Sequence, residues 1–328
     1  MEQQNNQLRW AVLGAGSIAN EMADALARGG RKLSAVGNRT PEKASAFAQK
    51  YGIPKVYEDL REMFTDPDID AIYIATSHNT HIAFIEEALS HGKHVLCEKA
   101  ITLNSGELDR AVRLARERRL VLAEAMTIYH MPLYRLLRER LESGALGKVN
   151  LIQASFGSLK PYDMTNRFFN PALAGGAALD IGVYALSLAR LFLESSPDQV
   201  KSFVRPAPTG VDETAVIVMM NPQRQMTNIT LSLHSKLPKR AVISCEKGYI
   251  EIDDYPRAEE CVIVDAATGA RETVKAGCTA DALRYEIEDL ERAAAGEGDM
   301  LLPYTVDVME IMTALRREWG VVYPEERG

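Results

Sequence analysis

The sequence predicts an α/β protein with two domains, the first over residues 1–125 and the second over residues 126–328. In the first part, short apolar runs alternate with amphipathic helical stretches, which is typical of a parallel sheet covered by helices on both faces. In the second part, several alternating runs follow one another with short turns, which predicts an α/β domain built on a large, mostly antiparallel sheet. A chain of 328 residues is long enough for both.

The first domain repeats a strand–helix rhythm. Its first strand, Leu8–Leu13, is followed by a glycine turn, a helical pattern and a second apolar run that ends at Gly37. The expected elements that follow are strands at 71–75, 94–97 and 120–123 and helices over 79–90 and 105–118.

The rhythm changes after Met126. A helix over 133–142 and a strand over 149–156 come first, and another helix starts near the glycine pair at 175–176. Strands are then expected at 200–204, 214–220, 228–233, 241–245, 249–252 and 261–264, and two amphipathic helices, near 281–293 and 305–319, close the chain.

The turn after the first strand has the spacing G-x-G-x-x-A. Gly14, Gly16 and Ala19 occupy the three defined positions. In a strand–turn–helix frame, the first glycine permits the tight turn and the second lets backbone N–H groups approach a pyrophosphate, while the alanine keeps helix and strand close. The pattern favours a dinucleotide site over a plain tight turn.

The end of the second strand indicates which dinucleotide binds. An NAD site usually places Asp or Glu there for the ribose 2′-hydroxyl, but this chain has Asn38-Arg39-Thr40 and no carboxylate before Glu42. A guanidinium can bind a 2′-phosphate through two hydrogen bonds, and a carboxylate would repel it. The sequence favours NADP(H), with NAD(H) as the alternative cofactor; the other interpretation of Arg39 is a solvated loop side chain.

Composition argues against several other functions. The net charge of −7 leaves no basic surplus for nucleic acid. No apolar run approaches the roughly 20 residues of a membrane span, and the polar start has no signal-peptide pattern. The cysteines lack C-x-x-C spacing, and the H-x-x-H pairs at 78/81 and 91/94 lack a nearby third ligand, so no metal site is expected. We expect a cytoplasmic protein without nucleic-acid or membrane partners.

Glu98 and Lys99 follow directly after the strand at 94–97. Ligands of doubly wound sheets bind beyond the carboxyl ends of the strands, so a lysine here points into the ligand crevice. Hydride transfer to or from nicotinamide needs a group that exchanges the hydroxyl proton, and Lys does so when its setting lowers its pKa towards neutrality. A surface lysine paired with Glu98 is the alternative on local sequence alone.

Asp180 and Tyr184 are four residues apart in the segment GGAALDIGVY (175–184). On a helix this spacing puts the carboxylate and the phenol on one face, and Gly182 between them leaves room for another group. The pair could position a substrate hydroxyl and share in proton transfer. The alternative is a core tyrosine hydrogen-bonded to a buried aspartate.

Together these segments resemble the glucose–fructose oxidoreductase / inositol dehydrogenase / MocA (Gfo/Idh/MocA) family over nearly the whole chain. The resemblance rests on GAGSIA (14–19), HNTHIAFIEEALSHGKHVLCEK (78–99) and GGAALDIGVYAL (175–186). It implies an N-terminal Rossmann dinucleotide-binding domain and a C-terminal open-sheet domain. Tyr184, with EAM (124–126) and NRFFNP (166–171), looks most like the dimeric dihydrodiol dehydrogenase and NADP-dependent xylose dehydrogenase branch.

By position, the resemblance makes Lys99 the catalytic lysine and Asp180 the carboxylate of the helix, and it places Tyr184 beside the reacting oxygen. Whether Lys99 or Tyr184 transfers the proton stays open. Tyr129 and Arg167 are weaker candidates for contact with substrate or nicotinamide. The residues expected to bind the cofactor are Gly14, Gly16, Ser17, Ile18, Asn38, Arg39, Thr76, His78, Asn79, His81, Glu98 and Lys99.

The expected activity is NADP(H)-dependent transfer of a hydride between nicotinamide and a secondary alcohol or carbonyl of a sugar, polyol or cyclic trans-diol. Two alternatives of the same fold stay open: a non-catalytic nucleotide-responsive binding protein and a redox-neutral NAD-dependent glycosidase. The joint presence of Lys99, Asp180 and Tyr184 argues against the binding protein, which has no need of all three. The resemblance, and the apolar outer face expected for a one-faced sheet, also predict a homodimer through the C-terminal sheet.

Overall fold

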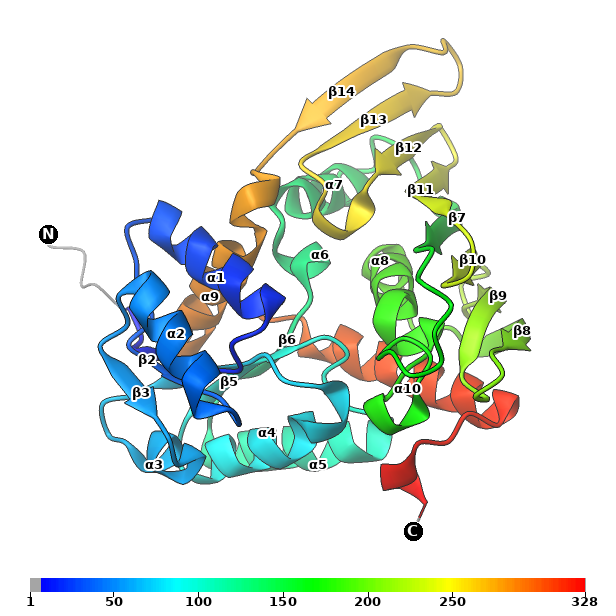
Figure 1. The fold of residues 1–328 in the computed structure, drawn as a ribbon. Helices are drawn as coiled ribbons and strands as arrows, with labels where there is room; N and C mark the ends of the chain where they lie inside the picture. The colour runs from blue at the N-terminus through cyan, green and yellow to red at the C-terminus, as the bar shows by residue number, and fades with distance from the viewer. Residues whose placement is uncertain (1–6, 328) are drawn as a thin grey trace, which may run out of the picture. The chain divides into compact units, whose positions relative to one another are not determined.

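The computed structural model describes residues 7–327, which form two compact units (Figure 1). Unit 1 comprises the chain up to Ala125 together with Ala280–Leu302, and unit 2 comprises Met126–Thr279 and the chain from Pro303 on. The first division falls at the predicted residue. The return of Ala280–Leu302 to unit 1 differs from the predicted organisation, in which everything after residue 125 belongs to the second domain.

Unit 1 is built on a sheet of six parallel strands in the order β3-β2-β1-β4-β5-β6. The chain moves outwards from β1 to β3 and then crosses back to β4. Neighbouring strands β1 and β4 therefore lead to opposite sides of the sheet, which is the switch point where doubly wound sheets bind ligands. The strands are Trp10–Leu13 (β1), Ala35–Gly37 (β2), Lys55–Tyr57 (β3), Ala71–Ile74 (β4), His94–Glu98 (β5) and Leu122–Ala125 (β6).

Helices cover both faces of this sheet, with α1 and α9 on one face and α4 and α5 on the other (Figure 1). Helix α5 has the predicted bounds, because Asn104 accepts a hydrogen bond from the Glu107 N–H (3.0 Å) at its start. The helices are Ser17–Arg28 (α1), Pro41–Tyr51 (α2), Leu60–Thr65 (α3), His81–Ser90 (α4, preceded by the 3₁₀ turn η1, His78–Thr80), Ser105–Arg118 (α5) and Ala282–Ala294 (α9).

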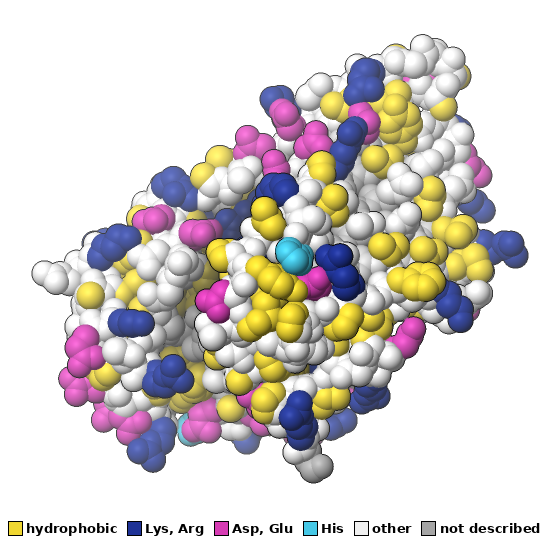
Figure 2. Space-filling view, turned by 45° about the vertical axis from the view of Figure 1, so that its right-hand side comes forward, with side chains coloured by type: hydrophobic (Ala, Val, Ile, Leu, Met, Phe, Trp, Pro, Cys, Tyr) yellow, Lys and Arg dark blue, Asp and Glu magenta, His cyan; other side chains and the backbone are white. Residues whose placement is uncertain are grey.

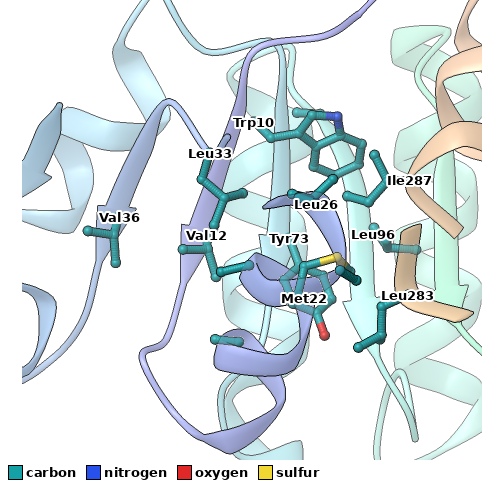
Figure 3. Packing of buried hydrophobic residues seen from close by; sticks show 14 of the residues in the cluster. Trp10, Val12, Met22, Leu26, Leu33, Val36, Tyr73, Leu96, Leu283 and Ile287 are labelled. Atoms are coloured by element: carbon teal, nitrogen blue, oxygen red, sulfur yellow. The ribbon is translucent and has the colours of Figure 1, made fainter. Parts of the chain in front are cut away.

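The apolar face of α9 explains why a late segment belongs to unit 1. Leu283 and Ile287 are buried in the core cluster that contains Trp10 and Leu26 (Figure 3). A hydrogen bond also joins α9 to β1, since Glu291 Oε1 accepts from Trp10 Nε1 at 3.0 Å. The helix was predicted, but its partner was not, because an amphipathic pattern shows that a face is buried and not against what.

Unit 2 contains an eight-stranded sheet in the order β14-β13-β12-β11-β7-β10-β9-β8. Only β7 and β10 are paired in parallel, so the predicted mostly antiparallel sheet is confirmed. The strands are Val149–Gly157 (β7), Gln199–Pro206 (β8), Asp212–Met220 (β9), Met226–Ser232 (β10), Leu237–Cys245 (β11), Gly248–Asp253 (β12), Glu260–Asp265 (β13) and Arg271–Lys275 (β14).

One face of this sheet is buried and the other is open. Along β9, Ala215 and Ile217 are buried, whereas Val216 and Val218 are 39% and 38% exposed. Helix α8 packs on β7 and β10 at the buried face (Figure 1). The remaining elements of unit 2 are Thr127–His130 (α6), Pro132–Glu142 (α7), Pro171–Leu173 (η2), Val183–Phe192 (α8), Tyr255–Arg257 (η4), Thr279–Asp281 (η5), Leu302–Trp319 (α10) and Pro324–Glu326 (η6).

The helix predicted to start at the glycine pair differs from a regular α-helix. It begins with a π-helical turn, Ala178–Gly182 (η3), and becomes α-helical at Val183. The stretch Pro171–Phe192 is long and apolar enough to cross a membrane, but 83% of its apolar 18-residue window is buried inside the structure. Its helical part, η3 and α8, is buried in unit 2 apart from the half-buried Tyr184, which accounts for its apolar character.

Candidate active site

The turn after β1 is closed tightly against the end of β4. Gly14 has a φ of +111°, and a Cβ there would lie 2.4 Å from the carbonyl oxygen of Ala75. Its N–H donates to the carbonyl of Gly37, at the end of β2, over 2.8 Å. A side chain at position 14 would therefore push apart the carboxyl ends of neighbouring strands.

The second glycine of the motif faces open space. Gly16 is the N-cap of α1, and no protein atom lies within 4 Å of where its Cβ would be. Gly16 and Ser17 are exposed, Ile18 is half-buried, and Ala19 is buried in the core. No acidic residue stands in the first turn of α1. An open helix N-terminus of this kind attracts an anion, so these residues fit a dinucleotide pyrophosphate.

The end of β2 presents a cation. The Asn38 side-chain amide donates to the carbonyl of Thr40 over 3.0 Å, which fixes the turn around Arg39. Arg39 is exposed, and no carboxylate in the described part of the chain forms an ion pair with it. Its guanidinium is thus available to a ligand at the same strand ends as Gly14.

Two histidines connect the loop after β4 to the loop after β5. His78 Nε2 lies 3.0 Å from the carbonyl oxygen of Lys99. His81 is fully buried, with Nδ1 3.0 Å from the Ala100 carbonyl and Nε2 3.2 Å from the Thr76 carbonyl. Burial lowers the pKa of His81 to about 4, so the ring is neutral at pH 7 and donates to one of the two carbonyls.

These contacts give the H-x-x-H pair a structural task. The Thr80 hydroxyl donates to Thr76 Oγ1 over 2.8 Å, which orders the start of the same loop, and Asn79 is half-buried beside it. Across residues 7–327, no group of three or more His, Cys, Asp or Glu side chains is placed to hold a metal ion. His81 can act on a bound cofactor only through the backbone that it supports.

The backbone around Lys99 is held by buried polar side chains of the neighbouring strands. The Lys99 N–H donates to Glu98 Oε2 over 3.3 Å, and the Tyr73 hydroxyl donates to the other carboxylate oxygen of Glu98. Beyond the cis peptide bond between Lys99 and Ala100, the Ile101 N–H donates to Glu124 Oε1 over 3.0 Å. Lys99 itself is half-buried at the carboxyl end of β5, at the sheet edge where the cofactor candidates lie.

Tyr73 and Glu124 were not identified as site residues from the sequence. Each lies inside an otherwise apolar buried strand, at AIYI (71–74) and LAEA (122–125). A polar group in such a run must find a partner, because burying it without one is unfavourable. That signal was present in the sequence, but it did not name the partners.

Two candidate residues of unit 2, Arg167 and Asp180, meet at the π-helical turn. Asp180 is 8% exposed, and its Oδ1 lies 3.5 Å from Arg167 Nη2. Arg167 stacks on the Phe168 ring with its guanidinium 4.4 Å from the ring centre. The structure therefore brings together Asp180 and Arg167, a contact that the sequence analysis did not predict.

Tyr184 lies one turn beyond Asp180, in α8. It is half-buried, with its ring centre 6.0 Å from that of Phe156. Both side chains line a cavity of about 790 Å³ that also contains Lys239 and Arg257. Tyr129 does not line this cavity; it is 8% exposed and packs edge-on against Tyr304 at 6.1 Å between ring centres.

Comparison with known proteins identifies the family. A sequence model described as the oxidoreductase family with an NAD-binding Rossmann fold (GFO_IDH_MocA) matches residues 8–126, and the GFO/IDH/MocA C-terminal domain matches residues 134–251. A trans-1,2-dihydrobenzene-1,2-diol dehydrogenase from Bos taurus is 34% identical over 75% of this chain and 74% of its own length. The chain belongs to the Gfo/Idh/MocA oxidoreductase family. The predicted family and fold class are confirmed.

Other members align over almost the full length. The trans-1,2-dihydrobenzene-1,2-diol dehydrogenase from Mus musculus is 29% identical over 98% of this chain and 99% of its own length. Among solved structures, a levoglucosan dehydrogenase in complex with NADH and levoglucosan has a TM-score of 0.86 at 19% identity, covering 96% of this chain and 97% of that chain. A 3-ketoreductase from Actinomadura kijaniata in complex with NADP and TDP-benzene has a TM-score of 0.82 at 22% identity, covering 95% and 97%.

Membership of this family makes the protein an NAD(P)-binding oxidoreductase, and unit 1 has the local features that such a cofactor needs. Gly14 and Gly16 shape the turn, Ser17 and Ile18 begin the helix, and Arg39 stands at the end of β2. The loop after β4 and the backbone at Glu98-Lys99 complete the same edge of the sheet. A pyrophosphate at the helix N-terminus fits these surroundings.

Replacing Gly16 with alanine should weaken cofactor binding without unfolding unit 1. The new methyl group meets no protein atom, but it enters the space through which the pyrophosphate approaches the backbone. We expect the dissociation constant for the cofactor to rise about tenfold or more, measured by quenching of intrinsic fluorescence, with the melting temperature nearly unchanged.

Gly14→Ala is the matched comparison, because its Cβ would clash with the Ala75 carbonyl oxygen. This variant should lose stability as well as binding. Unchanged cofactor affinity in Gly16→Ala would show that the pyrophosphate does not lie at this turn.

Proposed function

We propose that the protein is an NADP(H)-dependent oxidoreductase that interconverts a secondary alcohol and the corresponding carbonyl in a sugar, polyol or cyclic trans-diol. The observation that carries the proposal is Lys99, which is held by backbone hydrogen bonds at the carboxyl end of β5. It belongs to the same compact unit as the Gly14–Ser17 turn, and both lie at the carboxyl ends of the parallel strands. A proton-transferring group and a pyrophosphate site are thus combined on one sheet.

The substrate class rests on the relatives and on the cavity beside Tyr184. The aligned dehydrogenases are named for a cyclic diol, and one structural neighbour is named for levoglucosan. The cavity lining is rich in charged and polar side chains, including Lys239, Arg257 and Asp254. Such a lining suits a ligand with several hydroxyl groups better than an apolar ligand.

In the proposed mechanism, nicotinamide supplies the carbon that accepts or donates the hydride when the cofactor is bound. Lys99 and Tyr184 serve the reacting oxygen, one by removing or returning its proton and the other by donating a hydrogen bond. Asp180 orients the reacting hydroxyl, and the Arg167 guanidinium, 3.5 Å from Asp180 Oδ1, helps to hold that carboxylate in place.

Preference for NADP(H) is supported by the charge at the end of β2. Arg39 is exposed there, and the residues on either side, Asn38 and Thr40, carry no charge that would repel a phosphate. Because the guanidinium forms no ion pair with the described carboxylates, no existing contact has to break before a 2′-phosphate binds.

Removing either proposed proton-handling group should abolish most turnover. We expect Lys99→Met and Tyr184→Phe each to lower kcat by roughly 100-fold or more, the usual scale for an acid–base group. The measurement is the nicotinamide absorbance change with NADP⁺ or NAD⁺ and a panel of aldoses, inositols and cyclic trans-diols, with ketoses and osones for the reverse reaction.

Cofactor affinity should be kept in both variants and serves as the control for folding. Near-normal turnover in both would contradict the mechanism. Tightly bound cofactor without any net absorbance change in the wild-type protein would instead favour the redox-neutral glycosidase or the non-catalytic sensor.

Arg39→Ala should raise the KM for NADPH selectively. If the guanidinium binds the 2′-phosphate, its loss costs about 1.5–3 kcal/mol for NADPH, corresponding to a factor of roughly 10 to 150, and leaves NADH almost unaffected. Arg113→Ala, on the exposed face of α5, is a control with the same change of charge. Equal effects on NADPH and NADH would rule out this role for Arg39.

We further propose that the open face of the unit 2 sheet forms a homodimer interface. Phe203 is 85% exposed on β8 and stands opposite the exposed Val216 on β9. Figure 2, in which the right-hand side of Figure 1 comes forward, shows hydrophobic side chains gathered there among lysines and arginines. An exposed apolar patch of this kind on a sheet is typical of an association surface.

Phe203→Glu should therefore weaken self-association. We expect the dimer dissociation constant to rise by roughly tenfold or more, because a charge would replace a highly exposed aromatic side chain of the patch. Sedimentation velocity over a range of protein concentrations measures this, with Leu173→Glu outside the sheet as the control. A wild-type protein that stays monomeric at all concentrations would contradict the proposal.

A further inference from the structure

The segment that presents Arg167 and Asp180 is held by the hairpin between β8 and β9. The Thr209 hydroxyl donates to the carbonyl of Phe169 over 2.6 Å. The Tyr162 hydroxyl donates to Glu213 Oε2 over 2.8 Å. Hydrogen bonds to residues of one hairpin thus hold segment 158–178 near its start, at Tyr162, and in its middle, at Phe169.

The third fastening point is Asp212, the first residue of β9. Its Oδ2 accepts a hydrogen bond from the backbone N–H of Ala178 over 2.6 Å. Ala178 is the first residue of the π-helical turn that contains Asp180. The first N–H groups of a helix have no partner within the helix, and a carboxylate that accepts from one of them fixes where the helix begins.

Gly176, the second glycine of the pair before this turn, is required by the close approach of Asp212. Gly176 has a φ of +131°, and a Cβ there would lie 2.3 Å from Asp212 Oδ1. The Tyr323 hydroxyl donates to the carbonyl of Gly175 over 2.7 Å. The backbone that enters the π-helical turn is therefore clamped between a buried carboxylate and a buried phenol.

Asp212 is fully buried, although a buried carboxylate is unfavourable unless it is compensated. The charged and titratable groups that face it are Arg316 and Tyr323, with Glu326 beside them. Arg316 is already engaged, since both of its terminal nitrogens lie 2.9 Å from Glu326 oxygens. The Asp212 charge is therefore only partly balanced by Arg316.

We propose that Asp212 is a positioning residue for the reaction. Through the Ala178 N–H it fixes the start of the π-helical turn, and thereby the direction in which Asp180 and the following Tyr184 are presented. This inference rests on the proposed function, because it assigns a purpose to a geometry whose value lies in the roles of Asp180 and Tyr184. Asp212 touches neither substrate nor cofactor in this scheme and acts only through the backbone.

The burial of Asp212 gives this role a pH signature. Desolvation raises its pKa from 3.8 to about 7. Because the folded state binds the proton more tightly than the unfolded state, this group's contribution to stability falls as pH rises from about 4 to about 7. Protonation also weakens the carboxylate as an acceptor for the Ala178 N–H, so the positioning is strongest above pH 7.

The test compares Asp212→Ala and Asp212→Asn with the wild-type enzyme. We expect Asp212→Ala to lower kcat roughly 10- to 100-fold, the scale of a small misplacement of catalytic groups, with an unchanged dissociation constant for NADPH. Asp212→Asn keeps an oxygen acceptor, so it should recover most of kcat and lose the dependence on a group titrating near pH 7. Asp198→Asn, an exposed carboxylate before β8, is the control.

Amide hydrogen exchange of residues 178–184 gives a readout that needs no turnover. Asp212→Ala should speed exchange there at least tenfold, and Asp212→Asn should change it little. Unchanged exchange in Asp212→Ala, or faster exchange with kcat within twofold of wild type, would overturn the positioning role. If Asp212→Ala does not fold, an Asp212→Asn variant that keeps the wild-type pH profile overturns it equally. A wild-type protein without oxidoreductase activity would instead defeat the proposed function.

Discussion

The candidate cofactor site depends on the contact between the Gly14 turn and the Ala75 carbonyl. This contact requires the absence of a side chain at position 14, because a Cβ there would lie 2.4 Å from the carbonyl oxygen. It fixes the carboxyl ends of β1 and β4 next to each other at the switch point of the sheet. The open N-terminus of α1 and the loop after β4 then lie at one edge, where a dinucleotide can bind both.

A glycine in close contact with an oxygen atom also precedes a helix in unit 2. Gly176 admits the Asp212 carboxylate as Gly14 admits the Ala75 carbonyl, and in both places a helix with a proposed function begins within three residues. In unit 1 the helix terminus is left open, which suits an anionic ligand. In unit 2 an internal carboxylate occupies it, so that helix is fixed rather than available to an anion. The two glycine turns therefore have opposite consequences for binding.

Polar groups inside apolar elements organise the catalytic candidates. Tyr73 and Glu124 lie in buried strands, and each makes a hydrogen bond to the segment 98–101 that carries Lys99. His81 supports the same segment through its ring, with a pKa of about 4 that keeps it neutral. Because these groups form a connected set of hydrogen bonds, Lys99 is presented by a rigid backbone rather than by a free loop.

The sequence by itself predicted the glycine turn and most strands and helices, because periodicity and local motifs depend on neighbours along the chain. It missed the short elements α2, β3, α3 and β14. Lys99, Asp180 and Tyr184 were singled out by local motifs and the family resemblance, and their roles stay predictions. The sequence did not determine the docking of α9 into unit 1 or the π-helical start of the helix with Asp180. Nor did it reveal Asp212 as the partner of Ala178. These features join residues far apart in the chain, and only the packing of the folded units decides which buried face or polar group meets which.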